Sequence, residues 1–452
     1  MILMTPADKC TLSLFQKREL LEKNEILEYI NLFSKENFKP MAVDIKLKHS
    51  QYNIIKQKRK TYLLYNSLFN SMLTMSVHEF EQYKNIEFND LSLVETFVDN
   101  GFLIPEYIDE FAHYNYYQEN LNDLLPPDPH YTIVLTSKCN ARCIYCYEEG
   151  IKQYDMSEEC AGRIADVLLK SDKKIDITWF GGEPLLKTEL IDIISDKLIA
   201  EGKEFKSGII TNGSLLTEDI ILNCFPKWRI KWIQITIDGM NHEYAKRKCY
   251  YDTETDYFSK IMGILDILLN QDIVVNIWLN TDSENKQEII STAEYLKNKY
   301  SSYDNLEVYP AFLSGDNNII TSMVDRNSFC SEIYRMFPPE NGLIATTPRI
   351  SACFFQQKGD FVIDTDGSIL CCDRDVGKHR TKIADIFKAE NFDELSKPEY
   401  VIPEVRKQCM KCPYYPKCSG GCRDAYKCRC VFDACFMDRY KLDFILDRII
   451  DI

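Results

Sequence analysis

The chain lacks an apolar stretch long enough to cross a membrane, and it lacks an excess of basic residues. Its apolar runs all fall short of the roughly 18 to 20 residues that a membrane-spanning helix needs. Only 54 basic residues stand against 69 acidic ones, a formal net charge of −15, which repels phosphate backbones and anionic lipid surfaces. Charged side chains interrupt the start of the chain, unlike a signal peptide. We therefore expect no nucleic-acid partner, no membrane partner and a cytoplasmic location.

Cysteine is nearly missing from residues 1–125, where Cys10 stands alone, and is concentrated further on. The chain has 18 cysteines, ten of which fall between Cys353 and Cys435. In a reducing cytosol this density favours thiolate ligation of a metal over disulfides. With 452 residues, 45% of them apolar, the chain is long enough for two or three domains.

Residues 1–125 predict a small α+β module. Residues 52–55 and 62–65 read as two short strands around a charged turn at 56–60, and helical patterns follow near 77–83 and 91–100. A hairpin followed by helices resembles a winged-helix fold. The basic residues of the turn could hold an acidic peptide, although a solvated hairpin tip is the more ordinary interpretation.

A proline-rich segment at 124–129 ends this module, since proline cannot continue a helix. Beyond it, apolar runs of strand length alternate with amphipathic stretches such as 157–169 and 257–269. The six runs are 131–135, 175–180, 208–211, 232–237, 273–279 and 306–309. This repeat predicts an α/β fold over residues 126–335, a partial (β/α)6 barrel of TIM type with its chemistry at the carboxyl ends of the strands.

Residues 336–452 break this periodicity. They are rich in cysteine and punctuated by proline, which predicts a third, iron–sulfur or zinc region held together mainly by metal, with a closing helix at 437–450.

The loop after the first barrel strand carries a C-x3-C-x2-C triplet, Cys139, Cys143 and Cys146. Three close thiolates can hold three irons of a cubane cluster and leave the fourth iron free. A zinc site would more often have a fourth protein ligand and C-x2-C pairs. The triplet therefore favours an iron–sulfur cluster, with zinc as the alternative.

The second barrel strand ends in Gly181-Gly182-Glu183-Pro184. Glycines would let backbone carbonyls approach a ligand and Glu183 would add an anionic acceptor, an arrangement that suits a cationic amino group. Taken alone, this tetrapeptide is most often a tight turn. Two later strand ends, 211–213 and 236–239, place further polar groups at the same rim.

Together these residues resemble the radical S-adenosylmethionine enzymes, over about residues 130–320. The resemblance rests on the cysteine triplet, on Tyr145 and on the glycine-rich strand end. It implies a 4Fe-4S cluster whose open iron chelates S-adenosylmethionine, with an electron donor such as flavodoxin or ferredoxin. One electron from the cluster would generate a 5′-deoxyadenosyl radical, which abstracts hydrogen from the substrate. The implied cofactor contacts are Tyr145 at the adenine, Gly181, Gly182 and Glu183 at the methionine amino group, and Thr236 and Arg247 at ribose and carboxylate.

The cysteines of the third region are similar in spacing to the SPASM extension, which carries two auxiliary 4Fe-4S clusters. Spacing alone would equally allow two zinc sites, and the upstream triplet favours iron. The resemblance thus implies three clusters. The implied ligands are Cys353, Cys372 and Cys422 for the first auxiliary cluster and Cys409, Cys412, Cys418 and Cys435 for the second.

Several assignments in this region stay open. Cys371, Cys330 or the substrate could supply a fourth ligand to the first auxiliary cluster, and Cys428 and Cys430 crowd the gap before Cys435. The four isolated thiols, Cys10, Cys160, Cys224 and Cys249, are expected to be ordinary free cysteines.

Asp373 directly follows Cys372. In the anaerobic sulfatase-maturating enzymes, which share the SPASM arrangement, the matching aspartate is a proposed proton acceptor, and a carboxylate at this place suits a general base. A loop aspartate that caps backbone amides is the alternative.

Hydrogen abstraction followed by electron loss to an auxiliary cluster is a net two-electron oxidation. The leading hypothesis is a maturase that installs a thioether or carbon–carbon crosslink in a ribosomally made peptide, whose leader the N-terminal module would bind as an added strand. The alternative is an anaerobic sulfatase-maturating, formylglycine-forming enzyme. Oxidation of a small alcohol fits the same motifs, since a fold does not determine a substrate. A non-catalytic zinc protein is a further hypothesis, and it would lack the absorbance near ~400 nm of thiolate-bound iron.

Overall fold

The computed structural model describes residues 46–116, 129–146, 148–313, 323–339, 359–395, 407–420 and 437–451. Contacts divide the chain into two units, each built from separated segments. Met1–Pro126, Pro339–Cys353 and Pro403–Ile452 form what we call the N-terminal unit, and Pro127–Pro338 and Phe354–Ile402 form the barrel unit. The division into domains 1–125, 126–335 and 336–452 stays a prediction. Within the described ranges, no helix is both long and apolar enough to span a bilayer.

The barrel unit is built on a sheet of nine described strands, six of which are parallel and adjacent in chain order. The six are β6 (His130–Thr136), β7 (Ile175–Gly181), β8 (Phe205–Thr211), β9 (Ile230–Ile237), β10 (Val274–Thr281) and β11 (Leu306–Phe312). Each contains or overlaps one of the six predicted apolar runs, so the predicted α/β fold with a parallel sheet is confirmed. The carboxyl ends of all six strands meet at one rim.

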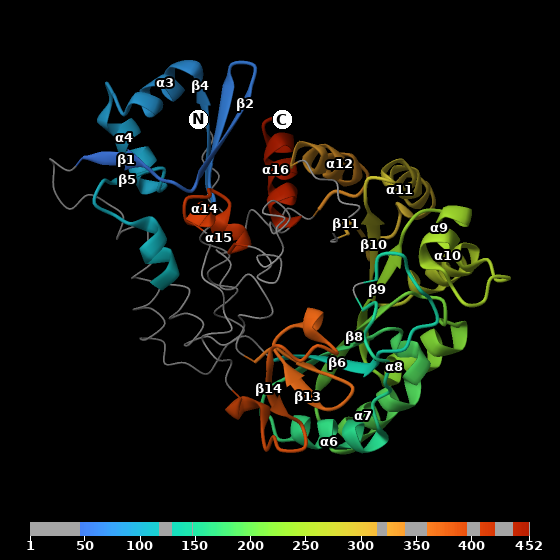
Figure 1. Cartoon of the computed structure of the whole chain (residues 1–452). Helices are drawn as coiled ribbons and strands as arrows, with labels where there is room; N and C mark the ends of the chain where they lie inside the picture. The colour runs from blue at the N-terminus through green and yellow to red at the C-terminus, as the bar shows by residue number, and fades with distance from the viewer. Residues whose placement is uncertain are drawn as a thin grey trace. The chain divides into compact units, whose positions relative to one another are not determined.

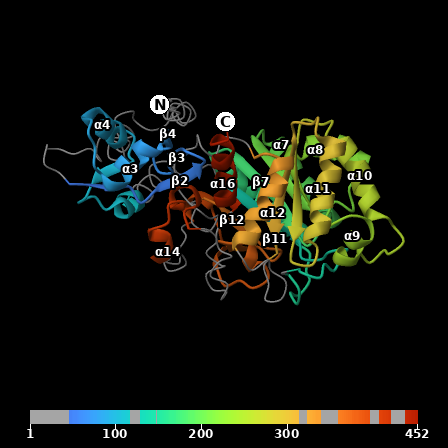
Figure 2. The same ribbon diagram turned by 90° about the horizontal axis from the view of Figure 1, so that it is seen from above.

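Helices connect these strands and lie outside the sheet, as Figures 1 and 2 show for α7 to α11. They are α6 (Glu158–Leu169), η2 (Pro184–Lys187), α7 (Thr188–Ala200), η3 (Ile220–Cys224), α8 (Phe225–Lys227), α9 (Asn241–Lys248), α10 (Tyr257–Leu268), α11 (Lys286–Tyr300) and α12 (Met323–Met336). The predicted start of α6 is correct because Ser157 caps it, its side chain accepting a hydrogen bond from the Cys160 amide. Buried aliphatic and aromatic side chains such as Ile133, Leu168 and Ile191 form the core between strands and helices.

Three short strands extend this sheet beyond β6. They are β12 (Phe361–Ile363), parallel to β6, and β13 (Ser368–Leu370) and β14 (Lys382–Asp385), both antiparallel to their neighbours. Arg163 on α6 fastens the segment after β14, donating to the carbonyls of Ile386, at 3.1 Å, and Ala389. The segment that carries Cys371 and Cys372 is therefore held directly by the barrel sheet.

The N-terminal unit contains an antiparallel sheet of β2 (Asn53–Lys58), β3 (Thr61–Asn66) and β4 (Ser71–Ser76), in that order. A strand pair, β1 (Leu47–His49) with β5 (Leu103–Pro105), and the helices α3 (Val77–Asn85), α4 (Leu91–Asp99), α14 (Lys407–Met410), α15 (Tyr415–Cys418) and α16 (Met437–Ile449) complete the described elements. The two predicted strands and helices of the hairpin region correspond to β2, β3, α3 and α4.

Both faces of this small sheet are covered. Leu64 and Leu73 pack with Tyr83 and Phe97 from α3 and α4, whereas the opposite face packs against α16. The residues on that second face are Ile54, Leu63, Tyr65 and Met72, and those of α16 are Leu442, Ile445 and Leu446. The sheet is thus the middle layer of a three-layer unit.

The basic hairpin differs from its prediction. Lys56 and Lys58 lie in β2, and only Arg59 and Lys60 form the turn, where Arg59 has a φ of 54°. Lys56 forms ion pairs of 2.9 and 3.0 Å with two aspartates of α16, Asp443 and Asp447. Two aspartates of a helix in the chain itself therefore pair with the lysine that was expected to meet solvent or an acidic peptide.

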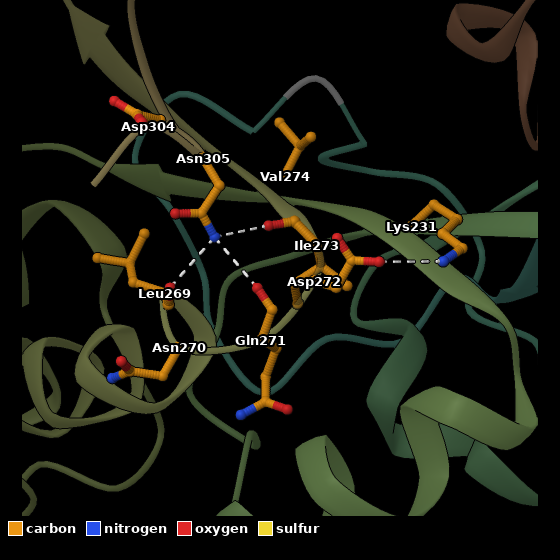
Figure 3. A pocket seen from close by; sticks show the side chains of 9 residues that line it. All are labelled: Lys231, Leu269, Asn270, Gln271, Asp272, Ile273, Val274, Asp304 and Asn305. Carbon is orange, nitrogen blue, oxygen red and sulfur yellow. Dashed lines mark hydrogen bonds and ion pairs between the residues drawn. The ribbon is translucent and has the colours of Figure 1, made fainter.

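At the amino ends of the barrel strands, the loop before β10 is closed by one side chain. The Asn305 amide nitrogen donates to the carbonyls of Leu269, Gln271 and Ile273, at 3.3, 3.3 and 2.9 Å (Figure 3). These residues line an open depression at the end of the sheet opposite the cysteine triplet.

Candidate active site

The loop that follows β6 carries Cys139, Cys143 and Cys146, all three as free thiols. Backbone hydrogen bonds to the end of α9 hold it in place. The Arg142 amide donates to the Lys248 carbonyl and the Ile144 amide to the Arg247 carbonyl, each at 3.1 Å. The sequence spacing predicted the three thiols as a group, and the structure adds the segment that fixes them.

Gly181 and Gly182 bring the end of β7 against the base of this cysteine loop. The amides of Gly182 and Glu183 donate to the carbonyls of Thr136 and Lys138, both at 2.9 Å. A Cβ at Gly181 would lie 2.2 Å from the Thr136 oxygen, and one at Gly182 would lie 2.4 Å from the Lys138 oxygen. Gly181 also has a φ of +141°, which residues with a side chain rarely adopt. The glycines are needed for close packing of protein backbone, and a ligand contact by them remains a prediction.

The three thiols lie close enough to affect one another electrostatically. Burial, with smaller contributions from the nearby Glu183, Cys143 and Cys146, raises the pKa of Cys139 to about 11. Burial also raises the pKa of Cys143 and of Cys146. Three mutually repelling thiolates in one loop are stabilised by a bound cation, and thiolates are the ligands that iron–sulfur clusters use. The donor set therefore fits a cluster held by three cysteines.

Glu183 is fully buried between the ends of β7 and β8. One carboxylate oxygen accepts hydrogen bonds from the Thr211 hydroxyl at 2.8 Å and the Leu185 amide at 3.1 Å, and the other accepts from the Asn212 amide at 2.9 Å. Burial raises the pKa of Glu183 to about 7, although these hydrogen bonds oppose the shift. The carboxylate thus ties two strand ends together, a role that its sequence position did not reveal.

Asn212 links that strand end to the cysteine loop. Its amide nitrogen donates to the Asn140 side-chain oxygen at 2.9 Å and lies 3.7 Å from the Cys139 sulfur. A donor beside a ligand sulfur is one of the means by which proteins tune iron–sulfur clusters.

Tyr145 contributes its hydroxyl to a polar network at the ends of β9 and β10. The hydroxyl donates to Asp238 at 2.5 Å and lies within hydrogen-bond distance of Asn280, at 3.0 Å, and of the Lys248 ammonium, at 3.1 Å. Burial and the Asp238 carboxylate raise the pKa of this phenol well above 10. The tyrosine therefore stays neutral and anchors the cysteine loop to two strands.

Thr236 and Arg247, the looser of the predicted cofactor contacts, both belong to this rim. The Thr236 hydroxyl accepts a hydrogen bond from Lys248 at 2.5 Å, and Arg247 forms a buried ion pair with Asp282 at 2.5 Å. The Arg247 guanidinium carbon also lies 5.8 Å from the centre of the Tyr145 ring. One buried nitrogen of Arg247, Nε, has no hydrogen-bond partner among the described residues, so a donor stays available to a ligand.

The structure thus brings together the cysteine triplet and the six predicted cofactor residues at one rim, and adds charged residues that sequence reasoning missed. Lys248 and Asp282 are the most buried of these additions. Asp282 directly follows a strand end, as Asp238 does, so its position was a usable signal. The sequence holds no such signal for Lys248, because the run Lys246-Arg247-Lys248 is typical of the solvated end of a helix.

The C-terminal cysteines fall in both units. Cys372 lies in the barrel unit beside Asp373, with 3.6 Å between its sulfur and the exposed carboxylate. Cys409 and Cys412 lie one turn apart in the N-terminal unit, joined by a backbone hydrogen bond of 3.1 Å, and Cys418 ends α15. Cys353, Cys422 and Cys435 lie outside the described residues, so both auxiliary ligand sets and the role of Asp373 remain predictions.

Comparison with known proteins identifies the central region. A model of the radical SAM superfamily matches residues 133–296, from β6 into α11. The radical SAM cyclopropyl synthase TigE of Paramaledivibacter caminithermalis is 22% identical over 96% of this chain and 97% of its own length. The cysteine-type anaerobic sulfatase-maturating enzyme of Clostridium perfringens is 23% identical over 65% of this chain and 87% of its own length.

A solved structure shares the fold. Native anSMEcpe with bound AdoMet and Cp18Cys peptide superposes with a TM-score of 0.57 at 20% identity, covering 72% of this chain and 98% of that chain. Hence 28% of this chain has no counterpart there.

Proposed function

From the premise that this chain carries a radical SAM domain and is a radical SAM enzyme, we propose that it matures a ribosomally made peptide by an oxidative crosslink. The observation that carries the proposal is the N-terminal unit, a three-stranded antiparallel sheet followed by two helices, which we interpret as a winged-helix-like module for peptide capture. The fold shared with anSMEcpe leaves more than a quarter of this chain unmatched, which supports an added function beyond that enzyme's.

In the proposed mechanism, Cys139, Cys143 and Cys146 would hold a 4Fe-4S cluster at the carboxyl rim. When bound, the cluster and S-adenosylmethionine supply a carbon radical that removes a hydrogen atom from substrate. Arg247, whose buried Nε is unpartnered within the described part of the chain, would bind the cofactor carboxylate, and Tyr145 would border the adenine. The chain's own part would be to fix the positions of these groups at one rim.

Peptide capture is assigned to strand β2. It is an edge strand of its sheet, and Ile55 on it is 44% exposed although neighbouring Ile54 is buried. An extended peptide can add to such an edge through backbone hydrogen bonds, with side-chain contacts giving specificity. The anSMEcpe structure that shares the fold has a bound peptide, Cp18Cys, which supports a peptide as the substrate class.

Between a thioether and a carbon–carbon crosslink, the carbon–carbon bond has the better support. The relative that matches nearly the whole length of this chain is named a cyclopropyl synthase, and a cyclopropyl ring contains a new carbon–carbon bond. Such a closure would remove two hydrogens from the peptide, one as an atom taken by the 5′-deoxyadenosyl radical and one as a proton and an electron. Two auxiliary 4Fe-4S clusters, held by the C-terminal cysteines, would accept that electron, and a flavodoxin or ferredoxin would supply the initiating electron.

A second candidate function is formylglycine formation in a sulfatase. The sulfatase-maturating enzyme of Clostridium perfringens matches this chain over 87% of its own length. Asp373 directly follows Cys372, and by resemblance we assign it the role of that family's proposed base. In that case the N-terminal unit would serve another purpose.

Mass spectrometry tests the two. Iron-reconstituted protein is incubated without oxygen with S-adenosylmethionine, a reductant and either a peptide encoded by a neighbouring gene or a sulfatase-motif peptide. We expect loss of two hydrogens from the neighbouring-gene peptide with matching 5′-deoxyadenosine. Reaction of the sulfatase peptide alone would establish the second function, and no 5′-deoxyadenosine under any condition would contradict both.

A matched pair of variants tests the capture site. I55D places a charge on the β2 edge, whereas L91D places one on α4 at a position that is 81% exposed. We expect I55D to lower kcat/KM at least tenfold for a peptide with its leader, with little change for a leaderless peptide, and L91D to leave both unchanged. Equal behaviour of the two variants would contradict the assignment.

A further inference from the structure

Lys248 is a buried cation at the centre of the candidate active site. It is the last residue of α9, and its side chain is 2% exposed. Its ammonium donates to the Thr236 hydroxyl at 2.5 Å, lies 3.1 Å from the Tyr145 hydroxyl and 3.5 Å from an Asp238 oxygen. The rings of Tyr145 and Tyr244 lie 5.9 and 5.8 Å from it.

The charge of Lys248 is only partly balanced by its neighbours. Asp238 is the carboxylate within ion-pair distance of it, and the other oxygen of Asp238 is already bonded to the Tyr145 hydroxyl. The adjacent cation, Arg247, has a separate partner in Asp282. The ammonium is therefore held beside aromatic rings and hydroxyls in a position with little solvent screening.

The cysteine loop lies within the field of this charge. The Lys248 carbonyl accepts the Arg142 hydrogen bond that holds the loop. The Lys248 ammonium itself lies 3.1 Å from the hydroxyl of Tyr145, which stands between Cys143 and Cys146 in the loop. Lys248 thus holds the loop by its backbone and places a positive charge beside it.

We infer that Lys248 is an electrostatic positioning residue for the cluster of the cysteine loop, a fixed positive charge that makes this cluster easier to reduce. The inference rests on the proposed iron–sulfur site. Reduction adds one negative charge to a cluster, and a nearby cation in a poorly screened site stabilises the reduced form. Because the initiating electron must enter this cluster, a cation here favours the first step of turnover.

The test is a potentiometric titration of reconstituted protein, with the reduced cluster measured by electron paramagnetic resonance. The relevant signal is the one that changes when S-adenosylmethionine is added. K248M removes the charge, K248R keeps it, and D238N removes the neighbouring negative charge. K246M is the matched control, since Lys246 lies on the same helix with its side chain 61% exposed and paired with Glu243.

At a fixed potential we expect the ratio of reduced to oxidised cluster to fall about tenfold in K248M, which is about 59 mV for a one-electron couple. K248R and K246M should stay within about twofold of the unaltered protein, and D238N should shift the ratio in the opposite direction. An unchanged ratio in K248M, or a fall in D238N, overturns the inference.

Two further outcomes are distinguishable. If K248M binds no iron, the D238N variant becomes the test, because it retains the lysine. In that variant only a raised ratio of reduced to oxidised cluster supports the inference. If the unaltered protein shows no signal that responds to S-adenosylmethionine, the proposed function is contradicted, and the inference, which rests on it, is contradicted as well.

Discussion

The two ends of the barrel's parallel strands differ in where they keep their charges. At the carboxyl end, Arg247 and Asp282 form an ion pair in which both side chains are 1% exposed. At the amino end, Lys231 and Asp272 are 3.7 Å apart with side chains 58% and 106% exposed. Figure 3 shows this pair beside the loop before β10. There the loop is closed by a neutral amide, that of Asn305.

This difference follows from the cost of burying ions. Removing a charge from water costs several kcal/mol, and a buried pair recovers this only with good geometry. The chain accepts that cost for the Arg247–Asp282 pair, at the end where loops converge on the cysteine triplet, and keeps the Lys231–Asp272 pair at the other end solvated. A buried ion pair is therefore a physical feature of the functional rim.

The largest effect is expected from breaking the buried pair. R247M leaves Asp282 buried without its cation, which should destabilise the protein by about 3–5 kcal/mol. D272N at the opposite end removes a solvated pair and should change stability by less than about 1 kcal/mol. Urea unfolding followed by circular dichroism compares the two. Similar losses of unfolding free energy in R247M and D272N would mean that the two ends of the strands do not differ in how they bury charge.

The next effect concerns the packing of the cysteine loop. G182A places a methyl group 2.4 Å from the Lys138 oxygen, so the loop must move. A displacement of about 1 Å can reduce turnover about 100-fold. We expect a similar loss here, together with lower iron content after reconstitution.

The control for this variant is G263A in α10, where no atom lies within 4 Å of the added group. Alanine is the better helix former by up to about 1 kcal/mol, so G263A should keep its iron and gain slight stability. Normal iron content in G182A would show that the close approach is not needed.

Two buried glutamates predict how stability depends on pH. Burial raises the pKa of Glu183, and of Glu110 in the N-terminal unit, to about 7. Since the folded protein keeps these protons where the unfolded chain has lost them, stability falls as pH rises from about 4.5 to 7, by up to about 1.4 kcal/mol per pH unit for each group.

E183Q and E110Q should each make that dependence less steep, measured as the unfolding midpoint between pH 5 and 8. The readout is the slope, because each substitution also alters hydrogen bonds. If only E110Q reduced the slope, the pKa of Glu183 in the folded protein would not be raised, which would contradict the effect of burial described for it.

The smallest effect is expected at the amino end. N305A removes one amide nitrogen that serves three carbonyls at a partly open site, and should cost about 1 kcal/mol. Iron content and 5′-deoxyadenosine formation should be unchanged. A loss of iron would mean that the two ends of the barrel are coupled.

The sequence predicted the long, repeating strands and helices well and the three-residue strands poorly. All six parallel strands were predicted because long apolar runs and helical periods are visible in the sequence. The strands β12 and β13 were not, because three residues are too few to show a period. They form strands by pairing, β12 with β6 on one side and with β13 on the other.

The run from Lys246 to Lys248 shows the same limit within the site. Basic residues in the last turn of a helix are commonly solvated and favoured by its dipole. Lys246 behaves so, with its side chain 61% exposed, but Lys248 is 2% exposed. Nothing local distinguishes the two, because the difference arises from packing against β9 and the cysteine loop.

The sequence by itself determined the cysteine spacing, the alternation of strands and helices, and hence the rim at which the chemistry lies. Only the tertiary structure decided that Glu183 ties two strand ends and that Lys248 faces Tyr145 and Thr236. The physical reason is distance along the chain. Spacing and periodicity are properties of neighbouring residues, whereas Tyr145 and Lys248 are separated by 103 positions and meet only when the sheet has formed.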